Sequence, residues 1–299
     1  MFQAVFITDT HITNSSRVRS GDVNEDICRK LKFVVDYCNK NDCVLLHGGD
    51  VFDKPTVPDI AKNEVIKILK GLKTKCYAIA GNHSELWGNP EYNYKTSYQT
   101  LISAGLVEDL DSVEGVDVGE CFITSKTPVI TRNKPQIVIN HAFLNQEDGR
   151  WTFRFTDLQT QDRAVVLLGH DHVEYEDLKL TDAVKIVRPG SFLRGIRTDT
   201  NLRAPQLVHI RVQDGKILTK KVPIATAREW TEIFKTKEIK TTKAQQHESY
   251  EEIIKSIRES QKTDMSFEEA IRTVTTDVVA DFTMKVLEEA NLENNFKRI

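Results

Sequence analysis

The sequence predicts an α/β protein, and three observations lead to that prediction. Apolar runs of strand length alternate with amphipathic stretches of helical period along residues 4–80. The resulting order of strand, helix, strand, helix and strand favours parallel strands joined by crossover helices. The chain has 299 residues, of which 39% are hydrophobic. That is enough for one large domain with a small one, or for two medium domains.

The pattern is most regular near the N-terminus. Residues 4–7 are an apolar run that predicts a buried strand. Residues 24–39 repeat apolar side chains at helical spacing, and Asp22 or Asn24 can cap that helix. The next elements are expected at 44–46 (strand), 60–72 (helix), 76–80 (strand) and 97–104 (short helix).

The rest of the chain predicts short strands followed by helices. Strands are expected at 121–123, 137–139, 165–168 and 184–187, then a hairpin of 207–212 with 216–222 through Asp214 and Gly215. The composition changes near Pro223, a linker rich in Lys and Thr follows at 235–246, and helices are expected at 250–259 and 267–290. We therefore expect one domain at 1–222 and a small C-terminal helical region at 223–299.

Charge and cysteine usage exclude some classes of protein. The net charge is -3 and the pI is near 6.3, which disfavours a binder driven by overall positive charge but leaves room for a local basic strip. The five cysteines are scattered and never form C-x-x-C, as is typical of reduced thiols in the cytoplasm. Neither a signal peptide nor a membrane-spanning run is visible, so a cytoplasmic protein without membrane association is expected.

Polar side chains that can bind metals follow five of the expected strands. These positions are Asp9 and His11, Asp50, Asn82 and His83, His141, and His170 and His172. Carboxylate, imidazole and amide groups are ligands for first-row divalent ions, and the absence of Cys disfavours a thiolate zinc site. Without His83, these are seven ligands, which are too many for one tetrahedral ion but suit two ions that share a bridging carboxylate. Each fragment alone is more typical of a turn or a core histidine, whereas the ordered set predicts a metal site.

The motifs D-T-H, G-D-V-F-D, G-N-H, N-H and G-H-D-H resemble the signatures of the calcineurin-like metallophosphoesterases over residues 2–222. The resemblance implies a two-sheet β-sandwich flanked by helices, with two divalent ions, Mn²⁺ first and Mg²⁺, Fe²⁺ or Zn²⁺ as alternatives. It divides the ligands into two groups bridged by Asp50: Asp9, His11 and His172 for one ion, and Asn82, His141 and His170 for the other. His83 would stand beside the ions as general acid or transition-state stabiliser.

The loop after Asp50 indicates which group within this family the chain resembles. Ser/Thr protein phosphatases carry Asp-Arg-Gly where this chain has Asp53-Lys54-Pro55, so they are disfavoured. G-D-V-F-D before a Pro-containing loop is similar to the bacterial SbcD-type nucleases and their meiotic-recombination-eleven relatives, and so is G-H-D-H before Pro189-Gly190-Ser191. This resemblance implies a DNA exonuclease and endonuclease that works in repair or recombination with an SbcC-type coiled-coil ABC ATPase. Ser84 replaces the Asp of many members, which bears on the orientation of His83 more than on metal binding.

Contacts with DNA and with protein partners are expected outside the ligand set. The candidate phosphate contacts are the arginines near the ligand loops: Arg17, Arg19, Arg188, Arg194 and Arg197. A solvated loop with salt bridges is an equal alternative for them. The C-terminal helices are expected either to grip the ATPase or to fold back on their own domain, and helices near 60–104 to pair two copies of the chain.

The expected function is thus a two-metal phosphodiesterase that cleaves DNA. Two alternatives stay open. A small-molecule or cyclic-nucleotide phosphodiesterase would use the same ligands. A non-catalytic scaffold of the same fold is the second alternative, and the complete ligand set argues against it.

Overall fold

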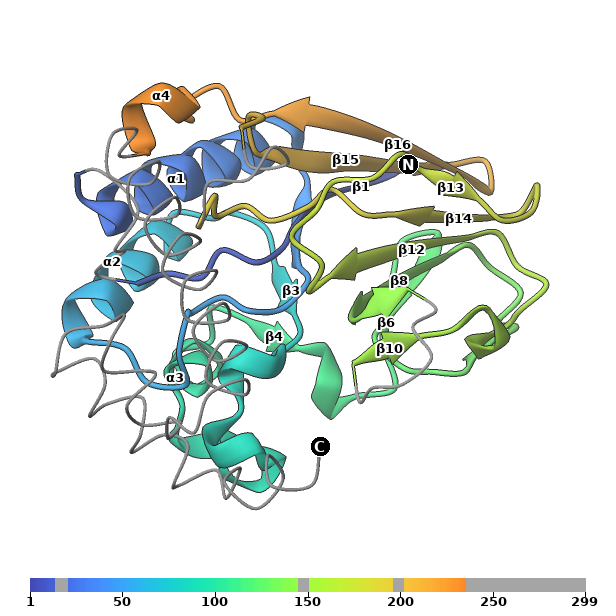
Figure 1. Cartoon of the computed structure of the whole chain (residues 1–299). Helices are drawn as coiled ribbons and strands as arrows, with labels where there is room; N and C mark the ends of the chain where they lie inside the picture. Colours follow the sequence, from blue (N-terminus) through green and yellow to red (C-terminus); the bar gives the residue numbers. More distant parts are fainter. Residues whose placement is uncertain (14–20, 145–150, 196–201, 235–299) are drawn as a thin grey trace, which may run out of the picture. The chain divides into compact units, whose positions relative to one another are not determined.

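The computed structural model describes residues 1–13, 21–144, 151–195 and 202–234, which Figure 1 draws in colour. The chain divides into two units, residues 1–234 and 235–299, and every described residue belongs to the first. The helices expected at 250–259 and 267–290 lie outside the described residues. The first unit continues past residue 222, since Ile224, Ile233 and Phe234 are buried in it.

Two six-stranded sheets form this unit, which confirms the predicted two-sheet α/β fold. The first sheet contains β1 (Phe2–Ile7), β2 (Val44–His47), β3 (Cys76–Ala78), β4 (Glu108–Asp109), β15 (Gln206–Gln213) and β16 (Lys216–Pro223). The second contains β5 (Val116–Val118), β6 (Cys121–Thr124), β8 (Gln136–His141), β12 (Ala164–Gly169), β13 (Leu178–Lys179) and β14 (Val184–Val187). Their spatial orders are β16-β15-β1-β2-β3-β4 and β13-β14-β12-β8-β6-β5.

Smaller elements complete the unit. Two short parallel pairs are β7 (Val129–Ile130) with β11 (Leu158–Gln159), and β9 (Phe143–Leu144) with β10 (Thr152–Phe153). The helices are α1 (Val23–Asn41), α2 (Asp59–Leu69), α3 (Ser97–Ser103) and α4 (Trp230–Ile233), with 3₁₀ turns η1 (Asn82–Ser84), η2 (Leu86–Gly88), η3 (Pro90–Lys95), η4 (Leu110–Ser112) and η5 (Phe155–Asp157). No helix among the described residues is long and apolar enough to cross a membrane.

Alternation along β1 builds two of the core layers. Successive side chains of a strand point to opposite faces, so Phe2, Ala4 and Phe6 share one face. These three pack in a core with residues of the second sheet, such as Ile139 and Leu167. On the other face, apolar side chains of β1 pack in the core beneath α1, α2 and α3. Figure 1 shows α1 and α2 together on that side of the first sheet.

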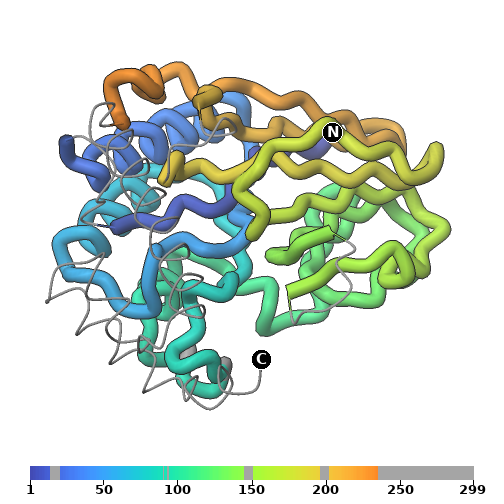
Figure 2. Tube along the Cα trace, viewed as in Figure 1, coloured from blue at the N-terminus to red at the C-terminus, as the bar shows by residue number. Residues whose placement is uncertain are grey.

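Local signals in the sequence account for the ends of several elements. The Asp22 carboxylate caps α1, accepting from the Glu25 N–H at 3.0 Å, which selects Asp22 over Asn24. Asp214 and Gly215 both have positive φ, as a two-residue hairpin turn requires, and they join β15 to β16. Figure 2 shows this hairpin (orange) beside the N-terminal strand (dark blue), although the two are distant in sequence.

Strand direction gathers the polar clusters. β1, β2 and β3 run parallel, so their carboxyl ends lie at one edge of the first sheet. β8 and β12 also run parallel to each other in the second sheet. Polar residues that follow parallel strands meet at such an edge, where α/β proteins commonly bind ligands.

Candidate metal centre

Strand pairing continues into the first two ligand loops. The N–H groups of Asp9 and His11 donate to the carbonyl oxygens of Gly49 and Asp50, at 3.1 and 3.0 Å. A further isolated bridge pairs Ile12 with Phe52. The loops after β1 and β2 are therefore held against each other by their own backbones, and this brings the Asp9, His11 and Asp50 side chains together.

The first group of expected ligands converges across the two sheets. Asp9 Oδ1 lies 3.6 Å from His11 Nε2 and 3.5 Å from His172 Nε2. The two Nε2 atoms are 3.0 Å apart. Asp9, His11 and His172 thus offer three donor atoms to one point, with the aspartate and His11 buried.

The second group converges on the side chain of Asn82. Its Oδ1 lies 3.0 Å from His141 Nε2 and 2.9 Å from His170 Nδ1. His141 is oriented by its other ring nitrogen, which lies 2.8 Å from the carbonyl oxygen of Gly48. Because a carbonyl only accepts, Nδ1 carries the proton, and Nε2 faces the other ligands.

Asp50 lies between the two groups. Its Oδ2 is 3.1 Å from His141 Nε2 in the second group and 3.8 Å from His11 Nε2 in the first. Its Oδ1 accepts a hydrogen bond from the backbone N–H of His83 at 2.9 Å, which fixes the carboxylate. This is the place that a bridging carboxylate occupies in a two-metal site.

The donor set fits divalent ions. Two ligand atoms bound at about 2.1 Å and at right angles lie about 3.0 Å apart. The closest donor pairs of this chain are separated by 2.9 to 3.1 Å, and each pair combines nitrogen or oxygen atoms only. Such donors suit manganese, magnesium, iron or zinc.

Electrostatics keep the carboxylates ionised. Burial is the largest influence on Asp9 and would raise its pKa, but hydrogen bonds to His11 and His172 outweigh it and hold the pKa well below its usual range. The pKa of Asp50 is also lowered, since contact with His141 outweighs burial. The carboxylates are therefore ready to bind cations at neutral pH.

The histidines of the second group are shifted in opposite directions. Burial favours the neutral form of His141, but its contact with Asp50 prevails and raises the pKa to about 9. Burial and the neighbouring His141 lower the pKa of His170 to about 4. A cation that binds here must displace the proton of His141, whereas His170 is already neutral.

Backbone strain is concentrated at the ligands. Asp9, His11, Asp50 and His170 all have φ between 41° and 79°, a region that residues other than glycine rarely adopt. Residues in such conformations cluster at functional sites, where the surrounding structure holds them. Gly81, with φ of 79°, precedes Asn82, and a Cβ there would overlap the side chain and backbone nitrogen of Asp50.

His83 stands beside the expected ligands. Its side chain is 39% exposed, and its Nε2 lies 4.0 Å from Asp50 Oδ2. Its Nδ1 is 2.6 Å from the carbonyl oxygen of Asp53. Ser84 is buried and donates from its hydroxyl to the Ala80 carbonyl at 2.8 Å.

The candidate DNA-contacting arginines differ in burial and in their contacts. Arg194 corrects the prediction: it is 2% exposed, and its guanidinium donates to the carbonyls of Arg203 and Arg228, so it is buried in the fold rather than open to a phosphate. Arg188 is half-buried and lies 3.7 Å from the ring centroid of Tyr175. Arg17, Arg19 and Arg197 lie outside the described residues.

Other residues at the site were not predicted as functional. Asp53 places its carboxylate 3.7 Å from His11 Nδ1 and joins His11 and His83 in a further metal-capable group. The sequence feature that could have identified Asp53 is its place as the last Asp of G-D-V-F-D. Phe143 and Trp151 pack their rings against His170, with ring centroids 4.3 and 6.2 Å away. No motif in the sequence predicts these contacts.

Comparison with protein families assigns the chain. The family model of the calcineurin-like phosphoesterases matches residues 2–174. The chain belongs to the calcineurin-like phosphoesterase family. All seven candidate ligands of this phosphoesterase, from Asp9 to His172, lie inside the matched range.

Solved structures resemble this phosphoesterase at low sequence identity. A crystal structure of TT1561 of Thermus thermophilus is 7% identical, with 74% of this chain and 98% of that chain covered and a TM-score of 0.38. A crystal structure of Vps29 complexed with Zn²⁺ from Entamoeba histolytica is 14% identical, with 75% and 99% covered and a TM-score of 0.36. No curated protein matches the phosphoesterase in sequence.

Proposed function

We propose that this phosphoesterase is a two-metal phosphodiesterase that cleaves DNA, as the nuclease subunit of a complex with an SbcC-type ATPase. The observation that carries the proposal is Asp50 Oδ2, which lies 3.1 Å from a donor of one ligand group and 3.8 Å from a donor of the other. Two divalent ions held there, Mn²⁺ first among them, would activate water and neutralise charge on a phosphoryl oxygen.

His83 supplies a proton-transfer group next to the ligands. The Asp53 carbonyl can only accept, so His83 Nδ1 is the donor in their 2.6 Å contact. Nε2 is then the atom that faces substrate. In the proposed reaction the ring, protonated on both nitrogens, gives its Nε2 proton to the leaving oxygen, or its Nε2–H stabilises the charge that develops there.

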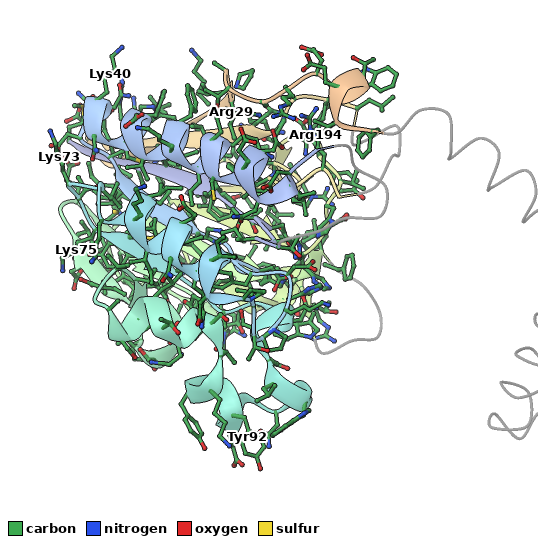
Figure 3. All side chains as sticks on the ribbon, turned by 90° about the vertical axis from the view of Figure 1, so that its left-hand side faces the viewer. Arg29, Lys40, Lys73, Lys75, Tyr92 and Arg194 are labelled. Atoms are coloured by element: carbon green, nitrogen blue, oxygen red, sulfur yellow. The ribbon has the colours of Figure 1, made fainter. Side chains whose placement is uncertain are left out.

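The DNA substrate is supported by motifs and by exposed aromatic residues of a segment that follows His83. The G-D-V-F-D and G-H-D-H motifs resemble those of the SbcD-type nucleases. Soon after His83, η2 and η3 project from the domain, with Tyr92 at the outer end in Figure 3. Trp87 is 75% exposed there, and the Lys95 ammonium lies 5.1 Å from the ring of Tyr92. Aromatic faces with a nearby cation bind unpaired bases and their phosphates.

The test is manganese-dependent digestion of end-labelled linear duplex DNA, with bis-p-nitrophenyl phosphate assayed in parallel. His83→Ala should lower cleavage of both substrates by about 10²- to 10⁴-fold, the range for loss of a general acid, while Mn²⁺ binding persists. His209→Ala is the matched control, because this histidine of β15 contacts Tyr37 of α1 and Gln3 near the start of β1. It should keep wild-type rates.

Other outcomes separate the alternatives. Cleavage of the small ester with DNA untouched, even after an SbcC-type ATPase is added, would contradict the nuclease proposal and favour a small-molecule phosphodiesterase. Bound Mn²⁺ with neither substrate cleaved would favour a scaffold. Pairing of two copies near α2 and α3 belongs to the same proposal, and light scattering that shows only monomer at micromolar protein would count against it.

A further inference from the structure

A short segment after β14 ties two ligand loops together. We call residues 189–194 the strap. Within it, the N–H groups of Phe192 and Leu193 donate to the carbonyls of Thr8 and Asp9, both at 3.0 Å. The N–H of Ser191 donates to the carbonyl of His172 at 3.1 Å. The strap therefore connects the loop that follows β1 in the first sheet to the loop that follows β12 in the second.

Lys30 of α1 anchors the strap from beneath. Its side chain is completely buried, and its Nζ donates to the carbonyl oxygen of Phe192 at 2.9 Å. The same Nζ lies 4.8 Å from the centre of the Phe192 ring. Asp26, one turn earlier on α1 and also buried, places its Oδ2 3.5 Å from Nζ.

Packing of α1 does not by itself require the buried ammonium of Lys30. Taking a charge out of water costs several kcal/mol, which a partner and hydrogen bonds only partly offset, and apolar residues of similar size often replace such pairs without loss of stability. Apart from Asp26, the other buried positions of α1 are apolar, among them Ile27, Leu31 and Val34. Lys30 differs from them in donating a hydrogen bond to the strap, at the Phe192 carbonyl.

We propose that Lys30 is a positioning residue of the metal centre. Its described contacts, Phe192 and Asp26, are not expected ligands. Lys30 holds the strap through Phe192, and the strap fixes the Asp9 loop relative to the His172 loop. Asp9 Oδ1 and His172 Nε2 lie 3.5 Å apart. Residues that orient metal ligands typically change metal affinity or activity by about 10- to 100-fold when they are mutated. The inference rests on the metal centre and not on the choice of DNA as substrate.

The experiment compares Lys30→Met with Lys32→Met in the full chain. Lys32 is the matched control, because it lies on the same helix, 68% exposed, and pairs with Asp36 at 3.3 Å. Mn²⁺ affinity is measured by calorimetry, and hydrolysis of bis-p-nitrophenyl phosphate is measured at saturating Mn²⁺. Lys30→Met should weaken Mn²⁺ binding by about 10- to 100-fold, and Lys32→Met should leave it unchanged. Lys30→Arg keeps a cationic donor and should recover part of the loss.

A purely structural role for Lys30 predicts a different result. Thermal melting of the metal-free variants by circular dichroism would then show a lower Tm for Lys30→Met, while the Mn²⁺ affinity of the folded protein stayed at the wild-type value. That outcome would overturn the proposal. A wild-type protein that binds Mn²⁺ but does not cleave DNA would contradict the proposed function and leave this inference intact.

A second variant covers the case in which Lys30→Met does not fold. Ser191→Ala leaves α1 untouched and removes a hydroxyl that bonds to the Leu193 carbonyl within the strap and lies 3.3 Å from the Asp9 carbonyl oxygen. It should weaken Mn²⁺ binding in the same direction with a smaller effect. Unchanged affinity in Ser191→Ala would overturn the role of the strap.

Discussion

At the scale of single residues, Asp50 is the side chain on which both ligand groups depend. Asp50→Asn keeps the shape but removes the negative charge between His141 and His11. We expect loss of at least one bound ion and a fall in bis-p-nitrophenyl phosphate hydrolysis beyond the about 10- to 100-fold typical of residues that only orient ligands. Metal content by mass spectrometry and the hydrolysis rate check this. Asp36→Asn, on the exposed face of α1, is the control. Full metal content in Asp50→Asn would contradict the bridging role.

The protonation of His141 makes metal binding depend on pH. Its folded-state pKa is about 9, above the ordinary 6.5, because contact with Asp50 prevails over burial. The contribution of this contact to stability is therefore complete below pH 6.5 and is lost as pH rises through about 9. Since the neutral ring is the ligand, Mn²⁺ affinity should increase across the same window, with proton release. Calorimetry in buffers of different ionisation enthalpy measures both, and an affinity that is flat with pH would refute the expectation.

At the scale of elements, the end of β12 approaches the first sheet too closely for a larger residue. A Cβ on Gly169 would overlap Thr8 Oγ1 and the carbonyl oxygen of Gly48, and Thr8 also donates to Asp9 at 2.7 Å. We expect Gly169→Ala to lower the free energy of unfolding by about 1 to 3 kcal/mol, as overpacking does, and to weaken Mn²⁺ binding. Denaturant titration checks the first effect. Gly195→Ala is the control, because its nearest neighbour, Leu193, lies 3.6 Å from the added Cβ. Equal stability of the two variants would contradict the close approach.

At the scale of the whole described unit, the candidate metal centre draws its residues from both sheets. Asp9, His11 and Asp50 follow strands of the first sheet, and His141, His170 and His172 belong to or follow strands of the second. A ligand that binds only the folded state at 100 times its Kd stabilises it by about 2.7 kcal/mol. For a domain of this size that corresponds to a rise in Tm of about 5 to 11 °C. Melting with Mn²⁺ and with a chelator measures the shift, and equal Tm values would show that the ions do not link the sheets.

The sequence alone predicted nine strands of the two sheets, the helices that cover the first sheet, and the order of the ligands, but not the short strands β4, β5 and β13. These follow from local patterns: the apolar run of β1, the Asp22 cap, and polar residues placed after each apolar run. The family's two-sheet architecture came from the motif resemblance rather than from periodicity. The structure then brought all seven expected ligands together, because parallel strands end at a common edge.

Only the tertiary structure decided which charged residues turn inward. From the sequence, Arg194 is one basic residue in a basic loop, and Lys30 is a polar position on an amphipathic helix. Their partners lie far along the chain: Phe192 is 162 positions from Lys30, and Arg228 is 34 from Arg194. Local patterns report the period of a helix or strand, whereas the burial of a charge depends on which distant carbonyl or carboxylate the fold brings beside it. The order of the ligands could therefore be predicted from the sequence, whereas the strap that holds two of the ligand loops could not.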